Sequence, residues 1–181
     1  MAALVAALVI RATDSSSAFV SITANRTGKS GAVMVGAFIA LCITQTFGAV
    51  IGALLSPHLK PDAARLLLGF ALVAAGSALF WPAKPKAPRT ARRPLLATVT
   101  FLVPTGLGDR TQVTTIAIAA GGNPAFAGIG GLIGSFIVLA MAAAAGEAVW
   151  QALPHRAARV SSGIVLVATG GWLAFSACGL L

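Results

Sequence analysis

The chain has few charged residues, and above all few acidic ones. Of its 181 residues only four are Asp or Glu, and charged residues of both signs make up 9%. Soluble domains carry about 25% charged residues, so this composition excludes an ordinary soluble domain. Hydrophobic residues reach 57%, and the segments between apolar runs are too short for a separate soluble domain. The sequence therefore predicts an integral membrane protein.

Residue types needed for several kinds of chemistry are also scarce. The chain has no Tyr, two His and two Cys, and it contains no CxxC, HExxH or GxSxG spacing. Cys42 and Cys178 lie in apolar runs, which favours buried apolar residues over a disulfide or a metal pair. We expect neither an enzyme nor a bound cofactor. The net charge of +9 sits in short loops, which favours topology and contact with the lipid bilayer over nucleic-acid binding.

Apolar runs separated by polar or Pro- and Gly-containing breaks predict six membrane-spanning helices. We expect them over residues 2–24, 31–55, 63–81, 95–119, 125–150 and 159–179. Six spans of ~20 residues use about 120 residues, which leaves only short loops. The longest break is a Pro-, Lys- and Arg-rich linker over 82–94. The predicted fold is thus an all-α membrane protein with one three-helix unit over 1–81 and a second over 95–181.

Positive charge in the loops predicts the orientation of the chain. Loops rich in Lys and Arg remain in the cytoplasm. With the linker in the cytoplasm, the cytoplasmic loops carry nine Lys and Arg residues and the outer loops carry two. We therefore expect a multi-pass protein of the cell inner (plasma) membrane, with the central linker in the cytoplasm and both termini outside. The sequence leaves open whether it forms a homo-oligomer.

The two halves of the chain share a spacing of residues. Asp14 is followed 95 positions later by Asp109. Four glycines of the first half recur 94 positions later, as Gly36 and Gly130, Gly52 and Gly146, Gly69 and Gly163, and Gly76 and Gly170. Three spans per half would give the halves opposite orientations. This is an inverted-topology repeat, typical of secondary transporters whose substrate site lies near the midplane where the repeats meet.

Both aspartates of that spacing lie near the middle of a long apolar segment. Asp109 stands in the stretch GLGDRTQ over residues 106–112, and Asp14 in the stretch RATDSSS over residues 11–17. A carboxylate at membrane depth is costly and usually marks an ion or proton pathway. These two residues are therefore the main candidates for function.

The stretch Leu107-Gly108-Asp109-Arg110-Thr111-Gln112 resembles the second signature of the GDT1 family, also described as UPF0016 or TMEM165-like. Members of that family carry two copies of Glu-x-Gly-Asp-Lys/Arg-Thr/Ser. The first stretch matches it only at Asp14 and Ser16. The family's glutamates are replaced by Arg11 and Gly106, so the chain resembles a divergent member. The resemblance implies a secondary transporter that exchanges Mn²⁺ or Ca²⁺ for protons.

Residue types in the two stretches agree with that chemistry. Hard divalent cations prefer oxygen ligands. We expect Asp14 and Asp109 to hold the metal ion and to accept protons, with neutral oxygen donors at Ser16, Thr111 and Gln112.

Two arginines and a glycine complete the candidate site. We expect Arg11 and Arg110 to adjust the electrostatic environment of the aspartates. Arg11 could form an ion pair with Asp14 or with Asp109. Gly108 would let the backbone approach a partner closely or would break the helix. Two alternatives stay open. One is a relative with another, anionic substrate attracted by the arginines, and the other is a non-transporting membrane interaction subunit whose Asp–Arg pairs are structural.

Overall fold

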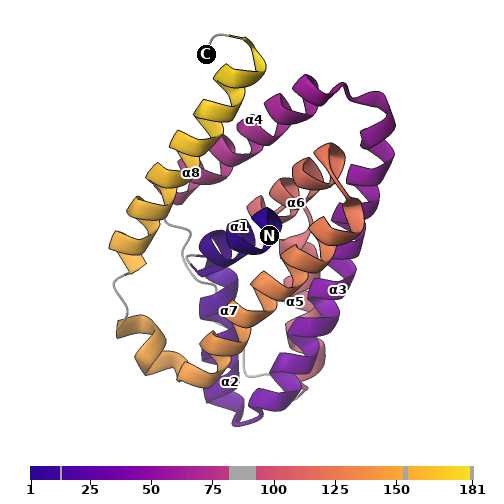
Figure 1. Cartoon of the computed structure of the whole chain (residues 1–181). Coiled ribbons are helices and arrows are strands. Elements are labelled where there is room, and N and C mark those ends of the chain that lie inside the picture. Colours follow the sequence, from indigo (N-terminus) through magenta and orange to yellow (C-terminus); the bar gives the residue numbers. More distant parts are fainter. Residues whose placement is uncertain (13, 82–92, 153–154, 180–181) are drawn as a thin grey trace.

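The computed structural model describes residues 1–12, 14–81, 93–152 and 155–179, which form helices joined by short turns (Figure 1). In chain order these are α1 (Ala2–Ala12), α2 (Ser15–Thr27), α3 (Ser30–Leu55), the 3₁₀ helix η1 (Ser56–His58), α4 (Pro61–Leu79), α5 (Pro94–Gly106), α6 (Arg110–Gly121), α7 (Pro124–Ala152) and α8 (His155–Ala177). The prediction of an all-helical protein is confirmed. Most of the predicted linker, residues 82–92, lies outside the described residues.

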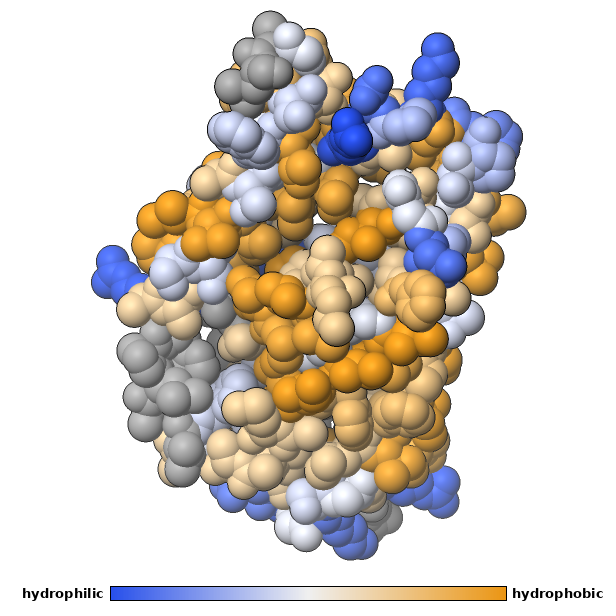
Figure 2. Space-filling view, viewed as in Figure 1, coloured by the Kyte–Doolittle hydropathy of each residue, from blue (hydrophilic) through white to orange (hydrophobic). Residues whose placement is uncertain are grey.

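The helices have the length and surface of membrane spans. Four of the described helices, α3, α4, α7 and α8, are long and apolar enough to cross a membrane. The pair α1 and α2, bent by 65°, provides a fifth span if its members count as one. Figure 2 shows apolar side chains over the middle of one face and polar ones toward its upper and lower ends. Soluble monomers rarely expose apolar patches of this extent, and the chain is a multi-pass membrane protein.

Local sequence explains where several helices begin. Pro61, Pro94 and Pro124 open α4, α5 and α7, at the position where proline has the right backbone angle and its missing N–H is not needed. Asp14 and Asp109 precede α2 and α6 as N-caps. Proline and aspartate therefore divide a nearly continuous apolar sequence into separate helices.

Two of the predicted helices are broken. The prediction of one continuous helix over 2–24 is wrong, because that segment forms α1 and α2. The prediction over 95–119 is wrong for the same reason, since that segment forms α5 and α6. The apolar pattern runs through both breaks, so hydropathy indicates a single span in each case. Each break leaves an aspartate, Asp14 or Asp109, outside regular helix.

Four clusters of buried apolar side chains form the core of the described residues, and two of them lie on either side of the first break. The larger lies among α2, α3, α5 and α7, with Phe19, Val20, Val33, Leu41, Leu102 and Leu139 at its centre. The smaller joins α1 to α4 and α8 through Ile10, Leu72, Leu79 and Leu166. The break between α1 and α2 lies between Ile10, which packs in the smaller cluster, and Phe19, which packs in the larger one. Helix packing therefore fixes the chain on both sides of the break.

Glycines bring α4 and α8 into direct backbone contact. A Cβ atom built on Gly69 would lie 2.7 Å from the Gly170 carbonyl oxygen, and one built on Gly76 would lie 2.8 Å from that of Gly163. The contacts are reciprocal, at 2.6 Å from Gly170 to Gly69 and 3.1 Å from Gly163 to Gly76. Small residues at this spacing let membrane helices approach closely.

Glycines 94 positions apart also make corresponding contacts elsewhere. Gly36 of α3 packs on α5, where its Cβ would lie 2.8 Å from the Leu95 carbonyl oxygen. Gly130 of α7 packs on α1, where its Cβ would lie 3.2 Å from the Leu4 nitrogen. In the same way α3 contacts α6 and α7 contacts α2. The long helices α3 and α7 thus each hold both parts of a broken segment.

Candidate functional site

Asp14 lies in the break between α1 and α2 and caps the second of these helices. Its backbone is extended, with φ −89° and ψ 155°. Its Oδ1 accepts a 2.8 Å hydrogen bond from the Ser15 nitrogen, and Ser17 Oγ donates to its carbonyl oxygen at 2.6 Å. An N-cap carboxylate satisfies a free N–H of the first turn and meets the positive end of the helix dipole. This explains why an acidic residue interrupts an apolar run here.

Asp109 has the same relation to α6. Its backbone is extended, with φ −67° and ψ 156°, and its Oδ1 accepts a 2.7 Å hydrogen bond from the Arg110 nitrogen. Gly108, just before it, has φ +83°, a conformation that glycine adopts without steric cost. Of the two roles predicted for Gly108, breaking the helix is the one found, since α5 ends at Gly106.

Arg11 joins the two aspartates through one nitrogen atom. Its Nη1 donates to Asp14 Oδ2 at 3.2 Å and to Asp109 Oδ2 at 3.0 Å. The Arg11 side chain is only 3% exposed, and the aspartates are 11% and 12% exposed. Arg11 and Asp109 are 98 positions apart in sequence. The fold therefore brings both sequence candidates to one buried point, with Arg11 between them.

The two hydroxyl groups predicted to supply oxygen ligands, those of Ser16 and Thr111, are both buried but differ in their contacts. Ser16 is buried; its Oγ donates to Asp14 Oδ2 at 2.7 Å and accepts from Arg11 Nη1 at 3.2 Å. Thr111 is 1% exposed, and its hydroxyl has no hydrogen-bond partner in the part of the chain that the structure describes. Thr111 follows Asp109 by two positions, as Ser16 follows Asp14. Ser16 therefore contacts Asp14 directly, and Thr111 is a buried hydroxyl at the corresponding sequence position beside Asp109.

Gln112 acts as a brace at the second break. Its Oε1 accepts a hydrogen bond from the Gly108 nitrogen, and its Nε2 donates to the Thr44 carbonyl oxygen at 3.1 Å. The side chain is 3% exposed. The amide thus ties the turn before Asp109 to α3, and in this conformation its oxygen is already engaged by the backbone.

Arg110 takes a different position from Arg11. Its side chain is half-buried, and its backbone nitrogen is the atom that contacts Asp109. Among the described residues, the ion pairs of the two aspartates all run to Arg11. Of the two predicted tuning arginines, Arg11 contacts the carboxylates with its side chain, whereas Arg110 contacts Asp109 with its backbone nitrogen.

The site has two negative charges and one positive charge. Each carboxylate uses Oδ1 to cap a helix and Oδ2 to accept from Arg11. At an effective dielectric constant of about 20, a charge pair at ~4 Å is worth ~4 kcal/mol, which offsets part of the cost of burying the ions. The described residues contain no group of three or more His, Cys, Asp or Glu able to hold a metal. A cation here would therefore depend on two carboxylates and on neutral oxygen atoms.

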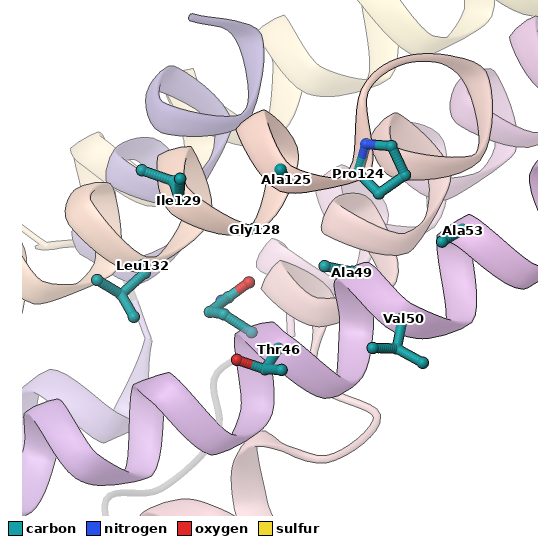
Figure 3. A pocket seen from close by; sticks show the side chains of 10 residues that line it. Thr46, Ala49, Val50, Ala53, Pro124, Ala125, Gly128, Ile129 and Leu132 are labelled. Carbon is teal, nitrogen blue, oxygen red and sulfur yellow. The ribbon is translucent and has the colours of Figure 1, made fainter.

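Sequence reasoning missed Gln45, a buried polar residue close to this region. It is 1% exposed, and neither of its amide atoms has a hydrogen-bond partner among the described residues. It lies at a groove of about 350 Å³ between α3 and α7. Figure 3 shows this groove between α3, which carries Thr46 and Ala49, and α7, which carries Gly128 and Leu132. The signal available in the sequence was the polar triplet Thr-Gln-Thr over 44–46, inside an otherwise apolar run.

A further acidic residue, Glu147, and the two cysteines have no described contact with this point. Glu147 makes a 3.7 Å ion pair with Arg26, whose side chain is 48% exposed. Cys42 is half-buried and Cys178 is exposed, so the expectation that both cysteines are buried is wrong. Position in an apolar run does not imply burial in protein here, because the outer faces of membrane helices are apolar as well.

Comparison with known proteins bears on the second half of the chain. Residues 94–180 match the model of the family described as "Divalent cation/proton antiporter GDT1". This segment runs from the first residue of α5 through α8 and contains Asp109. No curated protein and no solved structure matches the chain. The resemblance inferred from the motif around Asp109 is confirmed, since residues 94–180 carry the domain of the GDT1 family.

Proposed function

We propose that the chain is a secondary transporter that exchanges a divalent cation, Mn²⁺ or Ca²⁺, for protons across the membrane. The family is one of divalent cation/proton antiporters, which supports cation transport in general. In this proposal Asp14 and Asp109 hold the metal ion and the protons in turn. Ser16 and Thr111 supply neutral oxygen atoms, and Gln112 and Gly108 fix the turn that carries Asp109.

One observation carries this proposal. Carboxylates from two distant segments, each at a break in an apolar helix, meet within 3.2 Å of a single atom. Hard divalent cations require several oxygen ligands gathered in this way. Broken helices are the usual source of ion-binding groups in transporters, because they expose backbone groups and dipole ends at membrane depth.

We further propose that the chain is built from two inverted three-helix repeats, residues 1–81 and 95–181, joined by the linker 82–94. Counting each broken pair as one span gives six spans. The reciprocal pairs Gly69–Gly170 and Gly76–Gly163 support this arrangement. A two-fold relation that maps each residue to the one 94 positions later exchanges these two pairs. The corresponding contacts of Gly36 and Gly130 support it in the same way.

The orientation follows from the loop charges. We propose that the linker lies in the cytoplasm and both termini outside the inner membrane, because this puts nine Lys and Arg residues in cytoplasmic loops and two in outer loops. Inverted repeats would let the two broken segments enter the membrane from opposite sides. The two aspartates would then meet at the midplane, where alternating access requires the site to be.

A non-transporting role for the ion-paired cluster is the second candidate. It is favoured by the direct contacts of Arg11 with both carboxylates, which neutralise part of their charge without any ion. An anionic substrate has less support, because Asp14, Asp109 and Arg11 together carry a net charge of −1 and the Arg110 side chain makes no ion pair with either aspartate among the described residues.

Uptake into proteoliposomes separates these candidates. We expect a pH gradient to drive Mn²⁺ or Ca²⁺ uptake by the wild-type chain and Asp109→Asn to abolish it. Asp62→Asn is the matched control, because Asp62 is 73% exposed and pairs only with Arg65 at 3.7 Å among the described residues. Uptake by the control but not by Asp109→Asn supports exchange. No uptake of either ion by folded wild-type protein contradicts the proposal.

A further inference from the structure

Arg11 binds the same two oxygen atoms that a metal ion would need. The Oδ1 atoms of Asp14 and Asp109 are engaged by the first N–H groups of α2 and α6. Their Oδ2 atoms are the ones left to bind a cation, and both accept from Arg11 Nη1, at 3.2 and 3.0 Å. A guanidinium and a divalent cation therefore compete for one pair of carboxylate oxygens.

We propose that Arg11 is a built-in competitor of the transported cation, which must displace it in order to bind; this rests on the proposed function. Arg11 is 3% exposed and lies among the two carboxylates and Ser16 Oγ. The Ser16 hydroxyl, a predicted ligand of the ion, is thus also occupied by the guanidinium. When the ion displaces Arg11, the two Oδ2 atoms and the Ser16 hydroxyl all lose their hydrogen bonds to the guanidinium and can bind the ion.

The place of Arg11 in the fold bears on how it could be displaced. It belongs to the last turn of α1, directly before the break. Its guanidinium is held at Nη1, whereas its Nε is buried and has no hydrogen-bond partner in the described part of the chain. Because the described hydrogen bonds of this side chain all run from Nη1, beside a bend of 65° between α1 and α2, a movement of α1 would be enough to release it.

Binding of Mn²⁺ to the purified full chain tests this inference. We expect Arg11→Gln to lower the dissociation constant for Mn²⁺ at least about tenfold, because it removes the competing cation and leaves both carboxylates. Arg65→Gln is the matched control: it removes the same charge, but from a side chain that is 62% exposed and pairs with Asp62. We expect it to change the affinity by less than about threefold. Isothermal titration calorimetry in detergent measures both.

A double variant separates the effect of removing the competing guanidinium from the effect of changing the net charge of the site. Arg11→Gln with Asp14→Asn restores the wild-type charge of −1 but leaves a single carboxylate, and we expect it to lose the gain in affinity. If wild type and Arg11→Gln bind Mn²⁺ equally, the competition is refuted while the proposed function stands. If wild type does not bind and Arg11→Gln does, the competition is supported and exchange by the wild type is refuted. If neither binds, both proposals fail.

A measurement on the wild type covers the case in which Arg11→Gln does not fold. Phenylglyoxal modifies accessible arginine side chains, and mass spectrometry locates the modified residue. Arg11 should react slowly without metal, because it is buried, and faster at saturating Mn²⁺, because the ion displaces it. Protection of Arg11, or an unchanged rate while Mn²⁺ binds, would show that the guanidinium stays seated and would overturn the inference.

Discussion

The breaks at Asp14 and Asp109 reach the same local geometry from different sequences. Both aspartates have extended backbones, with ψ 155° and 156°, and both accept the next residue's N–H at 2.8 and 2.7 Å. Around them the sequences diverge. Arg11 stands three positions before Asp14, whereas Gly108, with φ +83°, directly precedes Asp109. An N-cap aspartate is the feature that the two breaks share.

The difference lies in how each break is fixed to the rest of the molecule. At the second break Gln112 reaches the Thr44 carbonyl oxygen, 68 positions away. At the first, Ser17 donates to Asp14 itself, and the long-range polar contact is the one from Arg11 to Asp109. The second break is therefore braced without the charges, while the first depends on them. The second half is also the part that matches the family model.

The largest effect expected is on transport, and it tests whether the two aspartates are equivalent. Asp14→Asn and Asp109→Asn should each reduce pH-driven uptake to the background of empty liposomes. Each substitution leaves one carboxylate and one guanidinium, a neutral pair with no net charge to hold a divalent cation. Asparagine is also a good N-cap, so α2 and α6 should still begin at the same residues. Uptake retained by Asp14→Asn alone would break the equivalence and make the first aspartate structural.

Two glycines at corresponding positions sharpen the comparison at the level of packing. Gly36→Ala would put a Cβ 2.8 Å from a backbone oxygen, whereas Gly130→Ala meets its nearest atoms at 3.2 Å. Because the backbone of α5 cannot move aside as a side chain can, Gly36→Ala should cost up to about 3 kcal/mol of stability. Gly130→Ala should cost clearly less. Melting temperatures in detergent measure both, with Gly31→Ala as control, since nothing lies within 4 Å of that Cβ.

The sequence was sufficient for the features that depend on composition and on single residues. The low charge and the long apolar runs predicted a helical membrane protein, and the motif around Asp109 identified the family. Asp14 and Asp109 were chosen because a carboxylate in an apolar run is costly, and the structure brings them to one point. Arg11 was expected to pair with either aspartate; it pairs with both.

The remaining features depend on geometry that hydropathy does not encode. The break at Asp14 was missed, and the break before Asp109 was only one of two roles expected of Gly108, because an aspartate changes the mean hydropathy of a long span very little. The role of Gln112 was missed because its partner Thr44 is far away in sequence. Gln45 was missed because a single glutamine in an apolar run does not indicate whether it faces lipid or protein.

The brace at the second break provides the next prediction. Gln112→Leu removes the hydrogen bonds to the Gly108 nitrogen and the Thr44 oxygen and leaves a buried N–H without a side-chain partner, which should cost about 2 kcal/mol. Ser17→Ala, at the corresponding position of the first break, loses one local bond and should cost about 1 kcal/mol. Melting temperatures of the two variants compare them. Equal losses would mean that the long-range brace adds nothing to the stability of the second break.

The smallest effect expected concerns Gly108. Nothing lies within 4 Å of a Cβ built there, so Gly108→Ala introduces no clash. Its φ of +83° is nevertheless unfavourable for alanine, which should cost about 1 kcal/mol. Gly171→Ala is the matched control, since that glycine is helical and its Cβ also meets open space; there alanine should be neutral or slightly stabilising. If only Gly108→Ala melts at a lower temperature, the difference gives the cost of the positive φ angle for alanine, separate from any effect of packing. If both variants melt like the wild type, the second break does not depend on its glycine, and the capping aspartate suffices at both breaks.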